Sequence, residues 1–172
     1  MTKGEFIEYC KGQGYNLTDD QFYGEREIKY SLYLNGLTSL PKGFNPVVGG
    51  NLDLRGLTSI PEGFNPEVGG FLDLRSLTTI PDGFNPVVPH GGLYLNNLTS
   101  IPEGFNPVAG GVLSLLSLTS IPEGFNPVVG DDLFLLSLTE ILENFNPNVK
   151  GSIYINNYID IKPIIEYINF NI

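Results

Sequence analysis

The stretch "LDLRGLTSIPEGFNPEVGGF", residues 52–71, holds one complete copy of a pattern that returns along most of the chain. Aligning the chain on itself places the first apolar residue of each copy at seven points, separated by 20 or, once, 21 residues. These starts are Leu32, Leu52, Leu72, Leu93, Leu113, Leu133 and Ile153. A fixed period of this length indicates a repeat architecture in which similar units stack on one another.

Each unit keeps six apolar positions, which in this copy are Leu52, Leu54, Leu57, Ile60, Phe64 and Val68. The alternating L-x-L at its start predicts a short strand with both leucines facing inward. The proline, glycine and asparagine residues that follow predict turns leading back to the next strand. One unit buries too little to fold alone, so the pattern predicts a mainly β fold, a parallel β-solenoid of about seven coils.

The glycine of the P-E-G-F segment, Gly63 in this copy, gives a more local prediction. In the sixth unit the same position is occupied by Asn144. Glycine and asparagine are the residues that best tolerate a positive φ. We therefore expect a left-handed backbone conformation at this position in every unit.

"LTSIPEGF" (57–64) preceded by "LDL" (52–54) resembles the leucine-rich repeat, and the resemblance covers roughly residues 32–155. The asparagine that this family usually carries between the strand and the next leucine is missing here, and the Asn-Pro of each unit is expected to take over its role in the turn. The resemblance implies a protein-binding scaffold without catalytic residues. The shortened segment leaves two shapes open, the family's curved horseshoe and a straighter right-handed β-helix.

The sequence predicts a single domain in three parts. Residues 1–31 form an N-terminal cap, residues 32–155 the solenoid and residues 156–172 a C-terminal cap. Thr2 and Glu5 have capping-box spacing, which predicts a helix over residues 2–12. Residues 27–34 alternate and predict a lead-in strand, and the C-terminal cap is expected to be helical after Pro163.

Composition excludes several classes of function. The net charge of −10 disfavours direct binding to nucleic acid or to an anionic membrane. A single cysteine excludes an internal disulfide, and no apolar run is long enough for a membrane span or signal peptide. These features predict a cytoplasmic protein.

Outward-facing strand positions change character along the chain. Asp53, Arg55, Asp73 and Arg75 are expected to pair diagonally across adjacent strands. From the fourth unit onward the same face becomes aromatic and aliphatic, as in "DLFLLSL" (132–138). An apolar patch of this kind often marks a contact site on a monomer. The predicted partner-binding residues are Tyr94, Asn96, Val112, Leu116, Phe134, Leu136 and Tyr154.

Two other interpretations of this patch stay open. The C-terminal tail, with Ile164, Ile165, Tyr167 and Phe170, would cover Leu116 and Leu136 and make them core. Alternatively, the patch would mediate weak self-association, so the protein is expected to be a monomer or a weak homo-oligomer.

An acidic stripe is predicted at the turns, formed by Glu62, Asp82, Glu103, Glu123 and Glu143. Its simplest interpretation is a solvated ridge that favours solubility. The alternative is an acidic decoy that imitates the phosphate rows of DNA and occupies a nucleic-acid-binding protein. Calcium is a weaker idea, because its sites need converging oxygen ligands and a straight stripe does not converge.

Catalytic signals are weak. His90 lies in the one-residue insertion "VVPHGG" (87–92) and is expected to be an exposed loop residue, while Cys10 is expected to be buried in the first helix. The recurring threonine of each unit is expected to form hydrogen bonds along the stack. No cofactor or metal is predicted. The sequence therefore predicts a non-enzymatic protein-binding scaffold, with an acidic decoy or a structural assembly component as alternatives.

Overall fold

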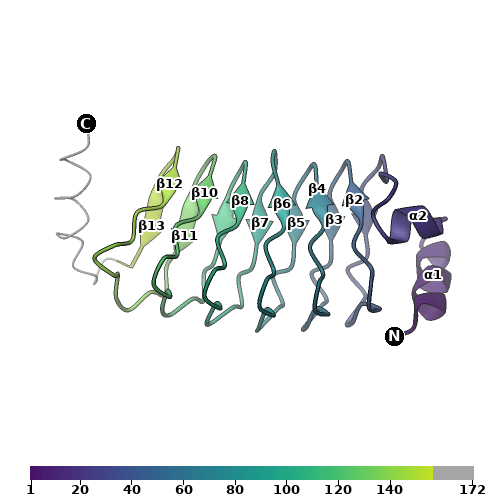
Figure 1. Ribbon diagram of the computed structural model, residues 1–172, viewed down its shortest axis with the longest axis horizontal. Coiled ribbons are helices and arrows are strands. Elements are labelled where there is room, and N and C mark those ends of the chain that lie inside the picture. Colours follow the sequence, from purple (N-terminus) through teal and green to yellow (C-terminus); the bar gives the residue numbers. More distant parts are fainter. Residues whose placement is uncertain (157–172) are drawn as a thin grey trace.

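The computed structural model describes residues 1–156, which form a parallel β-solenoid of about six turns preceded by two short helices (Figure 1). The first sheet has seven strands: β1 (Leu32–Tyr33), β3 (Leu52–Asp53), β5 (Leu72–Asp73), β7 (Leu93–Tyr94), β9 (Leu113–Ser114), β11 (Leu133–Leu135) and β13 (Ile153–Ile155). The second has six: β2 (Val47–Val48), β4 (Glu67–Val68), β6 (Val87–Val88), β8 (Val108–Ala109), β10 (Val128–Val129) and β12 (Asn148–Val149).

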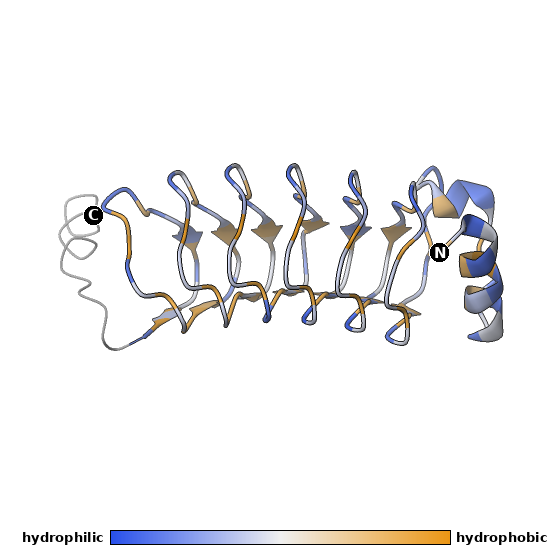
Figure 2. Ribbon diagram, turned by 90° about the horizontal axis from the view of Figure 1, so that it is seen from below, coloured by the Kyte–Doolittle hydropathy of each residue, from blue (hydrophilic) through white to orange (hydrophobic). Residues whose placement is uncertain are grey.

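Every strand pairs with the equivalent residues one unit away, for example Leu52 with Leu72 and Val48 with Val68. The two sheets appear as separate rows of strands along a nearly straight axis (Figures 1 and 2). The β-solenoid prediction is confirmed, and the stack has the straighter of the two expected shapes. The second sheet was not predicted, because its segments were interpreted as turns only.

The core between the sheets is built from ladders of identical side chains. The leucines of the L-x-L strands are buried, as are the second residues of the second-sheet strands from β2 to β10. One phenylalanine per unit stacks on the next with ring centroids 6.1–6.3 Å apart, from Phe44 to Phe145. Identical residues stack because the register repeats once per coil.

The Asn-Pro turns form a second ladder outside the core. The backbone N–H of Asn65 donates to the side-chain oxygen of Asn45 at 2.7 Å, and this bond recurs along the stack to Asn146. The Asn65 amide also donates to the carbonyl of Gly83 at 3.0 Å. The turn role expected of Asn-Pro is thus confirmed. The threonine prediction is confirmed where Thr119 Oγ1 donates to the Thr99 carbonyl at 3.1 Å.

The glycine prediction is confirmed in five units and wrong in the sixth. Gly43, Gly63, Gly83, Gly104 and Gly124 have φ between 75° and 86°. Asn144 does not have a positive φ. A side chain makes the left-handed conformation costly by about 1–2 kcal/mol, and the sixth turn avoids that cost with a different backbone conformation.

A different constraint explains the glycine at position 130, at the corner between the second sheet and the first. Gly130 lies so close to the preceding coil that a Cβ would come 2.1 Å from the carbonyl oxygen of Gly110. Its N–H donates to the Ala109 carbonyl at 2.8 Å. At Gly130, close backbone approach rather than a special dihedral angle therefore leaves no room for a Cβ.

The N-terminal end is closed by α1 (Lys3–Gly12) and α2 (Asp19–Phe22). The predicted capping box is confirmed, with the Thr2 N–H donating to Glu5 Oε2 at 2.7 Å. The helix α2 was not predicted. Rings of Phe6 and Phe22 lie 4.5 and 5.4 Å from Phe44 and so cover the first rung of the phenylalanine ladder.

The predicted lead-in strand over residues 27–34 is wrong in extent. Only a single bridge, Ile28 to Val48, precedes β1. Tyr30 lies between Ile28 and β1 and is exposed. The alternation of apolar and polar residues over 27–34 was therefore too short to predict a continuous paired strand. The predicted C-terminal cap lies outside the described residues, apart from Asn156.

Candidate functional site

The outward face of the first sheet is the main candidate site, and ion pairs cover it at β3 and β5, although Tyr33 on β1 is exposed. Asp53 and Asp73 point outward from β3 and β5 yet are only 1% exposed. The Arg55 Nε donates to Asp53 Oδ1 at 2.9 Å, and Arg75 binds Asp73 in the same way. The expected diagonal pairing is therefore wrong as the main contact, because each arginine folds onto the aspartate two residues before it.

One contact does cross between coils, from Arg55 Nε to Asp73 Oδ2 at 3.8 Å. The hydrogen bonds to Asp73, followed by its negative charge, raise the pKa of Arg75. The bonds to Asp53 likewise raise the pKa of Arg55. These arginines stay charged and cover the aspartates, so the negative charges on β3 and β5 are neutralised.

Replacing Arg75 by methionine is expected to destabilise the fold. The substitution keeps an apolar stem but leaves the carboxylate of Asp73 buried without its two strongest donors. A buried polar group that loses its partner costs about 1–3 kcal/mol. Urea unfolding monitored by circular dichroism measures the loss, and the double variant Arg75→Met with Asp73→Leu should recover most of it. A single variant as stable as the wild type would contradict the role of this pair.

The C-terminal half of the same face is open and apolar. Leu136, directly after β11, is 46% exposed, and Tyr154 on β13 is 44% exposed. The rings of Phe134 and Tyr154 stack at 4.6 Å with an interplanar angle of 6°. Leu116 lies one coil before Leu136 and is half-buried. The structure thus brings these four predicted residues together.

The three remaining predicted residues sit at the margin of this patch. Val112 precedes β9 and is half-buried, while Tyr94 on β7 packs edge-on against Phe71 at 6.3 Å. Ser114 separates Tyr94 from Phe134 in the strand register and is only 5% exposed. Asn96 has a buried Oδ1 that accepts no hydrogen bond from residues 1–156. The tail residues expected as an alternative cover lie outside the described part of the chain.

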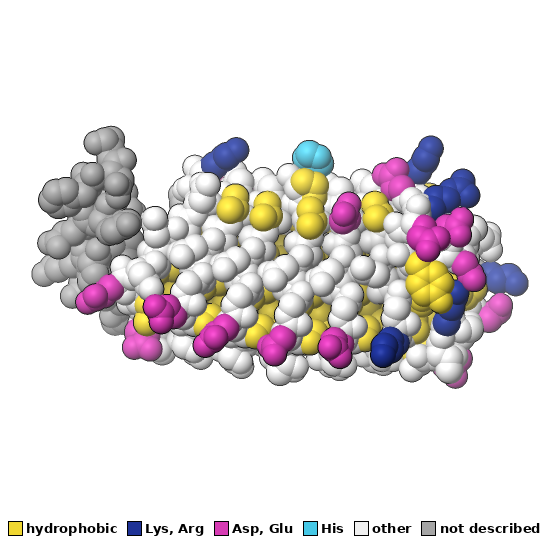
Figure 3. Space-filling model, in the orientation of Figure 1, with side chains coloured by type: hydrophobic (Ala, Val, Ile, Leu, Met, Phe, Trp, Pro, Cys, Tyr) yellow, Lys and Arg dark blue, Asp and Glu magenta, His cyan; other side chains and the backbone are white. Residues whose placement is uncertain are grey.

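The acidic stripe lies on a different edge, at the turns that connect the first sheet to the second. All five of its residues are exposed, and Figure 3 shows a row of acidic side chains along one edge of the solenoid. Glu123 accepts a hydrogen bond from the Asn144 amide at 3.4 Å. Within residues 1–156, none of the five forms an ion pair, so their charge faces solvent.

The second sheet presents a further apolar column that sequence reasoning missed. Val87, Val108 and Val128 are 45%, 46% and 42% exposed and follow one another along the face (Figure 3). The signal was available, because the pair of residues after each Asn-Pro keeps its second residue small and apolar while the first varies. Between the first three strands of this sheet lies an open groove of about 300 Å³.

His90 and Cys10 have the environments predicted for them. His90 is exposed at the rim of that groove, and Cys10 is fully buried. Burial raises the pKa of the Cys10 thiol to about 12, so it is not a ready nucleophile. In the described part of the chain, no three His, Cys, Asp or Glu side chains gather as a metal-binding group. Neither helix within residues 1–156 has the length and apolar content needed to cross a membrane.

Comparison with known proteins adds no relative: no protein-family model, no curated protein and no solved structure matches the chain.

Proposed function

We propose that this chain is a non-enzymatic protein-binding scaffold of leucine-rich-repeat-like design. It engages a protein partner through the apolar patch of Leu116, Phe134, Leu136 and Tyr154. The observation that carries the proposal is the large exposure of the neighbouring Leu136 and Tyr154 on a sheet whose strands β3 and β5 are covered by ion pairs. Large apolar side chains are rarely left bare without a contact role when they adjoin one another.

The patch is also held in place before any partner arrives. Phe134 and Tyr154 stack on each other, and their strands β11 and β13 pair over three residues. Side chains fixed in this way lose little conformational entropy on binding. Aromatic residues at the centre of such a patch commonly supply most of the binding energy.

Replacing Leu136 by aspartate is expected to weaken partner binding by at least about 30-fold, which corresponds to roughly 2 kcal/mol at a central contact. The partner is first captured from a lysate of the source organism, identified and purified. Its affinity for the wild type and the variant is then measured by isothermal titration calorimetry, after circular dichroism has shown that the variant is folded.

The matched control is Val108→Asp, because Val108 has the same exposure as Leu136, 46%, but lies on the second sheet. Equal losses for the two variants would exclude the first sheet as the specific face. The acidic decoy would instead be favoured if Leu136→Asp leaves the affinity unchanged while added salt, Glu103→Gln and Glu123→Gln each abolish binding. That second candidate is favoured by one observation, the exposed stripe, which forms no ion pair within residues 1–156.

A further inference from the structure

The second sheet is held together by a repeated backbone bond that is missing at one junction. The residue after each strand donates its N–H to a carbonyl one coil earlier, at 2.7–3.0 Å. These bonds run from Gly49 to Ile28, Gly69 to Val48, Gly110 to Val88, Gly130 to Ala109 and Lys150 to Val129. At the junction of β4 and β6 the donor position is occupied by Pro89.

Proline has no N–H, so the carbonyl of Val68 loses the donor that its counterparts have. The pairing of β4 with β6 is also shortened, to the single pair Glu67 and Val87. The neighbouring junctions each pair two residues. The cause is the insertion "VVPHGG" (87–92), which makes this unit one residue longer than the others.

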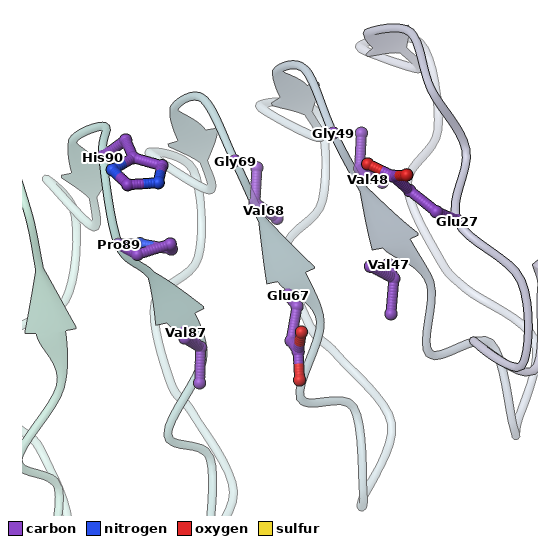
Figure 4. Close-up of a pocket in the computed structure, with 10 residues that line it drawn as sticks. All are labelled: Glu27, Val47, Val48, Gly49, Glu67, Val68, Gly69, Val87, Pro89 and His90. Atoms are coloured by element: carbon purple, nitrogen blue, oxygen red, sulfur yellow. The ribbon is translucent and has the colours of Figure 1, made fainter.

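The groove on the second sheet opens at this interruption. Its apolar lining comes from Val47, Val87 and Pro89, and its polar side chains are Glu27, Glu67 and His90. Figure 4 shows Val47, Glu67 and Val87 on three neighbouring strands, with His90 above Pro89 and Glu27 beside Val48. Neither Lys nor Arg lines the groove.

The two glutamates give the groove a negative charge. Glu27 and Glu67 are exposed, and neither forms an ion pair with any residue in 1–156. Glu67 occupies an outward position where β2, β6, β8 and β10 have valine. Its carboxylate therefore interrupts an apolar column at the same junction at which the backbone bond is missing.

We propose that this groove binds a Lys or Arg side chain of an extended partner segment, whose adjoining apolar residues lie on Val47 and Val87. An ammonium or guanidinium group carries donors only, which match the exposed carboxylate of Glu67 between the two valines, and Glu27 adds negative charge at the other end of the groove, beside Val48. Its aliphatic stem lies beside the valines while the charged head stays at Glu67. This site is on the opposite sheet from the patch of the proposed function and does not depend on it.

The probe is the peptide acetyl-VKVKV-amide, with acetyl-VEVEV-amide for comparison, titrated into the isotope-labelled protein and followed by NMR. The lysine peptide is expected to shift signals of Val47, Val87 and His90, and the glutamate peptide is not. Glu67→Gln is expected to raise the dissociation constant of the lysine peptide at least about 10-fold. Glu103→Gln, on the acidic stripe, is expected to leave it unchanged.

A second variant separates the groove from general attraction by an acidic protein. Pro89→Gly with deletion of His90 recreates the "VVGG" of residues 47–50 and keeps both glutamates, so the backbone bond can form. It is expected to close the groove and weaken the lysine peptide about 10-fold while remaining folded. The proposal is overturned if this variant binds as well as the wild type, if both peptides bind alike, or if none binds up to about 5 mM.

Discussion

Replacing Gly130 by alanine is expected to destabilise the solenoid by about 3 kcal/mol or more, at the upper end of what overpacking costs. The new methyl group would lie 2.1 Å from the carbonyl oxygen of Gly110 and 2.8 Å from its carbonyl carbon. Both are backbone atoms, so no side chain can rotate away to make room. The two coils would have to separate, which weakens the bond from the Gly130 N–H to the Ala109 carbonyl.

Gly124→Ala in the same coil is the matched control. Gly124 has a φ of 76°, but a Cβ there would meet nothing within 4 Å. The expected loss is therefore only the conformational cost of about 1–2 kcal/mol. Urea unfolding curves give both free energies, and equal losses would show that the corner glycine is not restricted by close packing.

Replacing Phe84 by alanine is expected to cost about 3–5 kcal/mol, as for other buried aromatic residues. Phe84 is 2% exposed and stacks on Phe64 at 6.3 Å and on Phe105 at 6.1 Å. The substitution removes a ring that touches both neighbouring coils. In a solenoid each coil contacts only its neighbours, so little else can compensate for the gap.

The comparison variant is Phe145→Ala, at the last rung of the described ladder. Its ring is 6% exposed and stacks on Phe125 at 6.1 Å. Within residues 1–156 it has a stacked phenylalanine on one side only, so it is expected to lose about half as much as Phe84, since fewer contacts are removed. Thermal and urea unfolding measure both variants. A loss at Phe145 as large as at Phe84 would contradict a ladder whose energy depends on two-sided stacking.

The sequence predicted the first sheet and most of the core because the period is so regular. Leu52 and Leu54 alternate with polar residues, and identical spacing in seven units leaves one register in which all leucines face inward. The capping box of Thr2 and Glu5 was predictable for a similar reason, because a few positions at fixed spacing determine it.

The second sheet was harder to predict because its two-residue strands are not marked by an alternating segment such as the L-x-L of the first sheet. A pair such as Val87-Val88 shows no alternation, although one side chain points outward and the other inward. The flanking prolines and glycines also favour turns, which concealed the strand. Comparison of all the units at this position would have found it, since only the second residue of the pair is always small and apolar.

The candidate site was partly predictable. The predictions that failed depended on side-chain conformation and on strand pairing, which the sequence pattern does not determine. Outward positions followed from the alternation, but burial of Asp53 depended on Arg55 folding back along its own strand. The groove on the second sheet depends on Pro89 lacking an N–H opposite one particular carbonyl. That consequence appears only once the strand pairing is known.

Because all the ladders share one register, the area of the surface can change without a change in the cross-section of the core. In a globular domain, enlarging a surface requires a larger core of different shape. Here one additional 20-residue unit would lengthen both sheets by about 4.8 Å and leave the cross-section unchanged. Contact area can therefore be adjusted through the number of units, and the choice of outward residues on each unit is independent of the leucine, phenylalanine and asparagine ladders that hold the stack together.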